Sequence, residues 1–267
     1  PDAVPPPLVA ADWAYLCDAA LARLAADASS VMYDAPPHGP VRIEALDPPS
    51  PYRFMIAGTS SEQGWRSAMR ALLGREGLAH ADDDLGGCNM YKRLDAACAA
   101  TAASRLAAAP YAVLYARGYD VTAESLRDAG DSPDLQVTVY DRHFDGIGSD
   151  GVNAIGVMED RMLFVREEAV ATGAVWLPMH LMYARLKVAI PTAPLLSDGT
   201  HATTAVQTGL AAMSYVARTG RTPSTDGLDA TSTRASAIGA VLVAQLSSLS
   251  RTGTYVPDDP ATRPRLR

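Results

Sequence analysis

Short apolar segments alternate with segments of helical periodicity over most of the chain, and this alternation constrains the fold more than any other feature. Residues 52–58 (YRFMIAG) form a short apolar run that ends in glycine, which is typical of a buried strand. Similar runs follow at residues 111–116, 135–140 and 174–178. Because strands that alternate with helices form parallel sheets, the pattern predicts a sheet with helices on both faces and an active site at the carboxyl ends of its strands.

Helices are predicted where apolar residues recur at intervals of three and four. The helix expected after residue 203 has one buried apolar stripe, formed by Val206, Leu210, Met213 and Ala217. Either Thr203 or Thr204 can cap this helix, and Thr204 with Gln207 fits a capping box. The other expected helices cover residues 13–26, 62–73, 90–108, 122–129, 152–172 and 237–246.

These elements predict a three-layer α/β/α sandwich with a mostly parallel, flavodoxin-like sheet in residues 51–250. A Pro-rich helical extension, residues 1–50, precedes it, and a frayed tail, residues 251–267, follows. The longest apolar segment, residues 237–246, is shorter than the ~18 residues that a membrane span requires. The sequence therefore predicts a packed terminal helix there and no membrane span.

Charge and cysteine content narrow the classes of partner and site. The 267-residue chain has a formal net charge of −7 and no run of Lys or Arg, so nucleic acid is not an expected partner. Cys17, Cys88 and Cys98 fit neither a disulfide framework nor a zinc motif. They are expected to be buried thiols, with a Cys88–Cys98 bond as the alternative. The compartment therefore stays open between a secreted or periplasmic location and the cytoplasm.

The segment SDGTH, residues 197–201, places an acid, a glycine and a histidine in one tight turn before a helix. A turn at Asp198 and Gly199 can fold the carboxylate back toward the imidazole of His201. A carboxylate on Nδ1–H fixes the tautomer and leaves Nε2 free as a base, which is two thirds of a nucleophilic triad. The same residues also fit an ordinary turn, with Asp198 as turn former and His201 exposed.

A candidate nucleophile follows the first core strand, in the segment AGTSSEQGW. Ser60 lies where the chain turns from the strand into a helix, and backbone N–H groups at a helix start point toward incoming negative charge. A serine there can attack a carbonyl while its own N–H holds the oxyanion. The alternative is that Ser60 or Ser61 only caps the helix.

Taken together, the serine after the first core strand and the D-x-x-H before a late helix resemble the SGNH (GDSL-like) hydrolases. The resemblance covers about residues 53–246 and is most specific over residues 176–223 (WLPMHLMYARLKVAIPTAPLLSDGTHATTAVQTGLAAMSYVARTGRTP), which look like the end of a bacterial branch of that family. The segment FMIAGTSSEQGW resembles the strand and G-x-S turn of that branch. The resemblance implies Ser60 as nucleophile, His201 as general base and Asp198 as its orienting acid.

The resemblance also implies an oxyanion hole, in which the family uses a glycine N–H and a side-chain donor. The segment LGGCN offers Gly87, preferred over Gly86, and an ordinary turn is the alternative at this position. The family's Asn in the third block is missing from ARGYD, so Tyr119 or Arg117 would have to replace it. Asn89 and Asn153 are further possible donors.

Two departures from the family pattern bear on activity. Thr59 stands where the usual first block, G-D-S, has Asp, which generally supports the turn. Loss of one oxyanion donor, as in the third block, can cost about a hundred- to a thousandfold in rate. A weak or very selective enzyme, or a binding module that has kept the fold, is therefore an open alternative.

Three other segments contain polar residues that are typical of binding sites. The segment DRHFDG, residues 141–146, lacks the closing Glu of a calcium loop, but Arg142 and His143 follow a strand end and are candidates for the substrate pocket. The segment HADDD, residues 80–84, could recruit a metal and is more simply a solvated acidic loop. His180 follows the strand that ends at Pro178 and is expected at the pocket rim. No metal site is predicted.

The function expected from the sequence is ester hydrolysis through a Ser60–His201–Asp198 triad, without a cofactor. The family resemblance implies a small-molecule or carbohydrate ester as substrate, with removal of a small acyl group. Acyl transfer to an alcohol on the same triad is the alternative within enzymes. Other partners and the oligomeric state are not indicated by the sequence.

Overall fold

A computed structural model of the chain describes residues 48–57, 60–84, 113–117, 136–140, 175–177, 179–198 and 201–249, with isolated positions between 100 and 108. Its centre is a parallel five-stranded sheet with the strand order β2-β1-β3-β4-β5. The strands are β1 (Tyr52–Ala57), β2 (His80–Asp84), β3 (Val113–Arg117), β4 (Gln136–Tyr140) and β5 (Val175–Leu177).

Four of these strands lie where the apolar runs predicted them, and β2 was not predicted. The expectation that residues 80–84 form a solvated acidic loop is wrong, because this segment pairs in parallel with β1, from Tyr52–His80 to Ile56–Asp84. The segment was not predicted as a strand because its composition is polar. Backbone hydrogen bonds to β1 and ion pairs to a helix, described below, hold it at the sheet edge.

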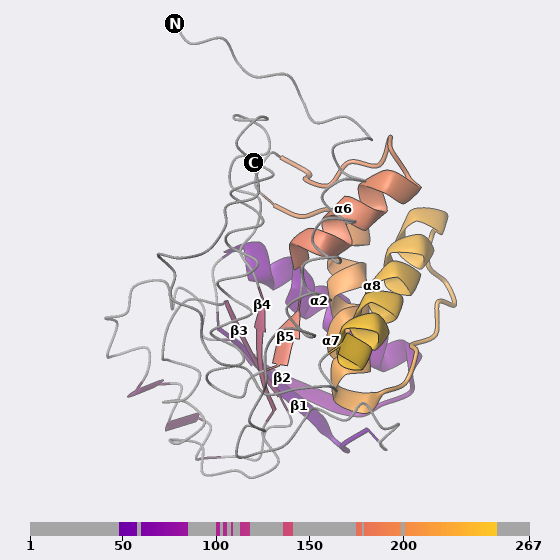
Figure 1. Cartoon of the computed structure of the whole chain (residues 1–267). Helices are drawn as coiled ribbons and strands as arrows, with labels where there is room; N and C mark the ends of the chain where they lie inside the picture. The colour runs from indigo at the N-terminus through magenta and orange to yellow at the C-terminus, as the bar shows by residue number, and fades with distance from the viewer. Residues whose placement is uncertain are drawn as a thin grey trace, which may run out of the picture.

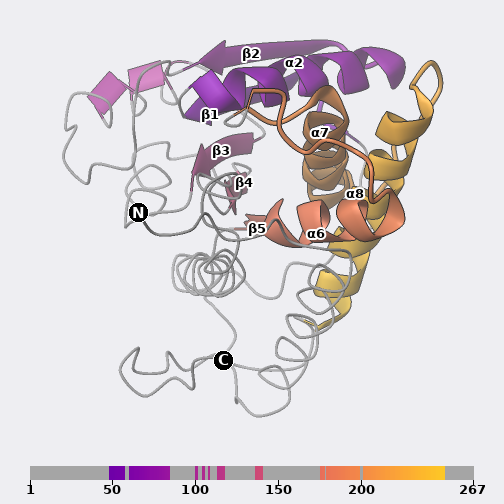
Figure 2. The ribbon, with the colours of Figure 1, turned by 90° about the horizontal axis from the view of Figure 1, so that it is seen from above.

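Four helices gather on one side of the sheet, with α8 outermost (Figure 1). The view from above shows the strands in a row with these helices beside them (Figure 2). Helix α2 packs on β1 and on α7, and α7 packs on β5 and along α8. The helices are α2 (Ser60–Arg75), α6 (Met179–Ala189), α7 (Thr204–Thr219) and α8 (Ala230–Leu249).

The helices expected on the other face of the sheet lie outside the described residues, apart from five isolated helical positions in the segment 90–108. The same is true of residues 1–47 of the predicted extension and of the whole predicted tail, residues 251–267. The three-layer sandwich with an N-terminal helical extension therefore stays a prediction. No helix within the described ranges is both long and apolar enough to cross a membrane.

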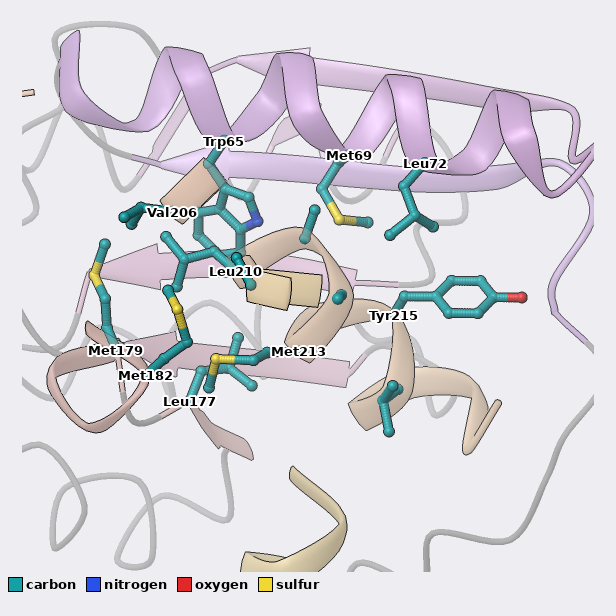
Figure 3. Close-up of a cluster of buried hydrophobic side chains, with 14 of the residues drawn as sticks. Trp65, Met69, Leu72, Leu177, Met179, Met182, Val206, Leu210, Met213 and Tyr215 are labelled. Atoms are coloured by element: carbon teal, nitrogen blue, oxygen red, sulfur yellow. The ribbon is translucent and has the colours of Figure 1, made fainter. Parts of the chain in front are cut away.

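The core between α2, α7 and the sheet is built from large apolar side chains. Trp65 and Met69 of α2 lie against Val206 and Leu210 of α7, and each of the four is at most 2% exposed (Figure 3). All four residues of the predicted stripe of α7 are buried, and so are most other residues of this helix, because α2, α6, α8 and the sheet all contact it. Burial of one such side chain contributes about 1.5–3 kcal/mol, so this contact holds the two helices together.

Helices α7 and α8 approach each other through glycines. A Cβ atom added at Gly239 would lie 2.4 Å from the carbonyl oxygen of Gly209 and 2.9 Å from Cγ of Met213. A Cβ at Gly209 would lie 2.9 Å from the sulfur of Met182 and 3.1 Å from the carbonyl oxygen of Ala235. The two backbones can therefore come this close only because neither position carries a side chain.

An ion-pair cluster ties the edge strand β2 to α2. Asp82, whose side chain is 6% exposed, accepts hydrogen bonds from Nε of Arg66 and, at 2.6 and 2.9 Å, from Nε and Nη2 of Arg70. Burial alone would raise the pKa of Asp82, but the bonds from Arg70 and Arg66 lower it below its ordinary value. Arg70 and Asp82 have the bidentate Arg–carboxylate geometry that gives strong charge-assisted bonds.

We expect Gly239→Ala to lower the free energy of unfolding by about 1–3 kcal/mol, because the new methyl group meets backbone as well as a side chain. The matched control is Gly74→Ala in α2, where an added Cβ meets nothing within 4 Å. This control should be neutral or stabilising by up to about 1 kcal/mol through helix propensity. Urea unfolding measures both, and equal stability of the two variants would contradict the close α7–α8 contact.

We expect Asp82→Asn to lower the free energy of unfolding by about 1–3 kcal/mol at neutral pH, since it removes a charge-assisted pair. A lowered folded-state pKa gives stability that is present above the unfolded pKa, about 3.9, and is lost as the pH falls through the folded pKa. Stability should therefore fall less below about pH 4 in Asp82→Asn than in the wild type.

The control for this experiment is Asp83→Asn, the next residue of β2, whose side chain is 40% exposed and 3.7 Å from Arg105. It should change stability by less than about 1 kcal/mol, as expected of an exposed pair. Urea unfolding at several pH values measures all three proteins. An unchanged pH profile in Asp82→Asn would show that the cluster does not stabilise the fold.

Candidate active site

Asp198 contacts His201, as the D-x-x-H spacing predicts. One carboxylate oxygen of Asp198, Oδ1, accepts the backbone N–H of His201 at 2.8 Å. The other, Oδ2, lies 2.6 Å from Nδ1 of the His201 ring. The acid therefore holds both the backbone and the side chain of the histidine, and the spacing of three residues makes this contact local to one turn.

This contact determines which ring nitrogen of His201 is available for chemistry. An ionised carboxylate can only accept hydrogen bonds, so Nδ1 must carry the proton that bonds to Asp198. In the neutral ring Nε2 is then the lone-pair nitrogen. The His201 side chain is 38% exposed and that of Asp198 is 55% exposed, so the pair lies at the surface where a substrate could approach.

An antiparallel bridge joins the segments on either side of the Asp198–His201 pair. The backbone N–H of Ser197 donates to the carbonyl of His201 at 2.8 Å, and that of Thr203 donates to Leu195 at 3.0 Å. Leu196 and Ala202 form the bridge between these bonds. The imidazole is therefore carried by the loop of residues 195–203, here called the histidine loop, whose two ends are bonded to each other directly before α7 begins at Thr204.

The predicted capping box at the start of α7 is not formed. Thr203 is the N-cap, its side chain makes no cap hydrogen bond, and its hydroxyl donates instead to the carbonyl of Pro194 at 3.1 Å. Gln207 does not reach back to the cap, since its Nε2 donates to the carbonyl of Ala202 at 2.8 Å. Both polar side chains are used to hold the histidine loop, which is a tertiary demand that outweighs the local capping pattern.

Ser60 is the first residue of α2, which follows the end of β1 at Ala57. Its side chain lies outside what the structure describes, so its distance to His201 stays a prediction. The position of its helix is described: Gly64, four residues further on, lies against the side chain of Gln207, which in turn holds Ala202 next to His201. The starts of α2 and α7 therefore lie side by side.

The close-up of the core shows the same arrangement. Trp65, Val206 and Met179, which lie near the starts of α2, α7 and α6, gather at one end of the core (Figure 3). Leu72 and Tyr215, which lie further along α2 and α7, are at the other end. The two helices thus run in the same direction from the end of the sheet at which the strands finish.

The carboxyl edge of the sheet carries a further predicted position, Arg117. The parallel register pairs Ala57 with Ala116 and Arg117 with Tyr140, so the carboxyl ends of β1, β3 and β4 are level. The strand order changes direction between β1 and β3, which is the point where open parallel sheets bind ligands. Arg117 is the last residue of β3 and is on this edge, although its side chain is not described.

The remaining predicted residues are not tested by the geometry. His180 is the second residue of α6, and only its backbone is described. The candidate oxyanion and pocket residues outside the described ranges are Gly86, Gly87, Asn89, Tyr119, Arg142, His143 and Asn153. Within the described part of the chain, no group of three or more His, Cys, Asp or Glu residues is arranged to hold a metal ion.

Sequence reasoning assigned Gln207 only to a cap and missed its contact with Gly64. The signal that could have found it is the glycine inside the predicted helix 62–73, since a mid-helix glycine costs about 1 kcal/mol against alanine and often marks a close approach. The partner of that approach could not be identified from the sequence.

No known family model matches the chain, and no curated protein matches it. The functional assignment therefore depends on the chain's own residues: the Asp198–His201 pair, the position of Ser60 at the start of α2, and the contact between the starts of α2 and α7.

Proposed function

We propose that the protein is a serine ester hydrolase of the SGNH type, with Ser60 as nucleophile, His201 as general base and Asp198 as the acid that orients it. The observation that carries the proposal is the Asp198–His201 pair, at 2.6 Å, which leaves Nε2 of an accessible imidazole as the acceptor nitrogen. The start of α2 beside the histidine loop supports Ser60 as the third member.

The proposed reaction has two halves. Oγ of Ser60 attacks the ester carbonyl while Nε2 of His201 takes its proton, and the C–O bond to the alcohol then breaks as His201 returns that proton to the leaving oxygen. Water attacks the acyl-enzyme, gives its proton to His201, and the proton returns to Ser60 as the carboxylic acid leaves. Asp198 stays ionised throughout and stabilises the imidazolium.

Negative charge on the carbonyl oxygen needs donors, and a helix start supplies them. The first N–H groups of a helix have no partner within the helix, and the helix dipole places partial positive charge there. Ser60 is the first residue of the 16-residue α2, so we assign its N–H as one donor to the oxyanion. We assign the second donor to Gly87, as the family resemblance implies.

The substrate class follows from the resemblance and is consistent with the exposure of the pair. We propose a small acyl group carried by a carbohydrate or similar polar alcohol. The side chains of His201 and Asp198 are 38% and 55% exposed, so an alcohol can reach the pair from solvent. Acyl transfer differs only in the acceptor of the second half-reaction, where an alcohol replaces water.

We expect a fluorophosphonate probe to label the wild-type chain and to leave Ser60→Ala unlabelled, because only an activated serine reacts with it. His201→Ala should slow labelling by about 10²- to 10⁴-fold, the usual contribution of a general base. Ser61→Ala is the matched control, and it should be labelled like the wild type. Labelling that persists in Ser60→Ala, or an unlabelled wild type without turnover of acetylated sugars, would contradict the proposal and favour a binding module.

We expect Asp198→Asn to lower turnover of p-nitrophenyl acetate by up to about 10⁴-fold and to leave a small residual rate, because the amide can stabilise the wrong ring tautomer. His80→Gln in β2, which removes a histidine away from the proposed triad, is the control and should keep the wild-type rate. Wild-type turnover in both Asp198→Asn and His201→Ala would show that the base and its partner have been assigned to the wrong residues.

A further inference from the structure

The side chain of Gln207 lies directly against the backbone of α2. A Cβ atom at Gly64 would be 1.8 Å from Nε2, 2.3 Å from Cδ and 2.5 Å from Oε1 of Gln207. The whole carboxamide therefore occupies the place where any other residue at position 64 would carry its side chain. Gly64 lies within an α-helix and is not among the glycines with positive φ, so the backbone conformation does not require glycine there. The close approach does.

The same carboxamide holds the histidine loop. Its Nε2 donates to the carbonyl of Ala202 at 2.8 Å, and Ala202 is 4% exposed and directly follows His201. The backbone N–H of Gln207 donates to Thr203 at 3.0 Å, so the side chain starts from the fixed first turn of α7. One residue thus contacts both the loop that carries the base and the helix that starts with Ser60.

Helix geometry relates this contact to the proposed nucleophile. Ser60 is four residues before Gly64, and residues at this interval share one face of a helix. At a rise of about 1.5 Å per residue the two positions are about 6 Å apart along the axis. The distance between the start of α2 and the histidine loop is therefore set one helical turn from Ser60.

We propose that Gln207 is a positioning residue, which sets the separation of Ser60 and His201 by filling the space over Gly64 while it holds the carbonyl of Ala202. This inference rests on the proposed function, because it assigns the residue a part in the Ser60–His201 reaction. Displacement of reacting groups by about 1 Å can cost a hundredfold in rate, so a spacer of this kind affects turnover more than substrate binding.

Four variants separate positioning from simple stabilisation. Gly64→Ala adds a methyl that displaces the Gln207 carboxamide, and Gln207→Met keeps the bulk but removes the donor. Gly74→Ala makes the same change in the same helix where a Cβ meets nothing within 4 Å. Tyr215→Phe removes the 3.3 Å bond from α7 to Glu76, at the other end of the α2–α7 contact.

We expect Gly64→Ala and Gln207→Met each to lower kcat for p-nitrophenyl acetate by about ten- to a hundredfold with KM changed less than about threefold. Fluorophosphonate labelling should slow by the same factor. The double variant should lose no more than either single variant, because both act on one contact. Gly64→Ala should unfold in urea close to the wild type, since alanine favours the helix by about 1 kcal/mol. Gly74→Ala and Tyr215→Phe should keep the wild-type kcat.

Three results would overturn the inference, and they can be told apart. Wild-type kcat in both Gly64→Ala and Gln207→Met, while labelling still depends on Ser60, overturns the positioning inference alone. A wild-type chain that is neither labelled nor active overturns the proposed function and this inference with it. A fall in kcat that Tyr215→Phe shares, in step with lost stability, also overturns it, because any weakening of the α2–α7 contact would then suffice.

Discussion

The packing of α2 against α7 is the contact on which the rest of this structure depends. Helices α2 and α7 lie on the same side of the sheet. The space between them is filled by Trp65, Met69, Val206 and Leu210. These residues are about 140 positions apart in the chain, as the bond between Tyr215 and Glu76, with a separation of 139, illustrates. Without this contact the candidate nucleophile and base would have no fixed relation.

The parallel sheet explains where α2 starts, and the segment between α6 and α7 explains where α7 starts. In a parallel sheet every strand ends at the same edge, and each helix that directly follows a strand starts there. Helix α2 follows β1, and α7 follows β5 by way of α6 and the histidine loop. The topology therefore places Ser60, at the start of α2, at this edge, whereas His201 is brought there by the loop between α6 and α7 and by the contact of Gln207 with Gly64.

The sequence was sufficient to predict local interactions but not interactions between residues far apart in the chain. The contact of Asp198 with His201 spans three residues, so a turn pattern was enough to predict it. The apolar strands and the buried stripe of α7 were predictable because periodicity reports burial directly. The strand β2 was not, since HADDD has the composition of a loop and its place depends on β1 and on Arg66 and Arg70. The role of Gln207 was hidden for the same reason, because Gly64 is remote in sequence.

Local and non-local contacts also position different parts of the candidate site. The base and its acid are held by bonds of 2.6 and 2.8 Å within one turn, so their geometry survives modest shifts of the surrounding helices. The position of His201 relative to the start of α2 is not held by a bond within one turn. A hydrophobic contact alone would let α2 and α7 slide past each other, because it is non-directional. A directional contact is needed near the site, and the Gln207 carboxamide between Gly64 and Ala202 supplies it. At the far end of the same helix pair, Glu76 does so through Tyr215 and the backbone N–H of Ser224. Polar contacts thus lie at both ends of an interface whose free energy comes mainly from its apolar centre, and the contact made by Gln207 is the one next to the candidate site.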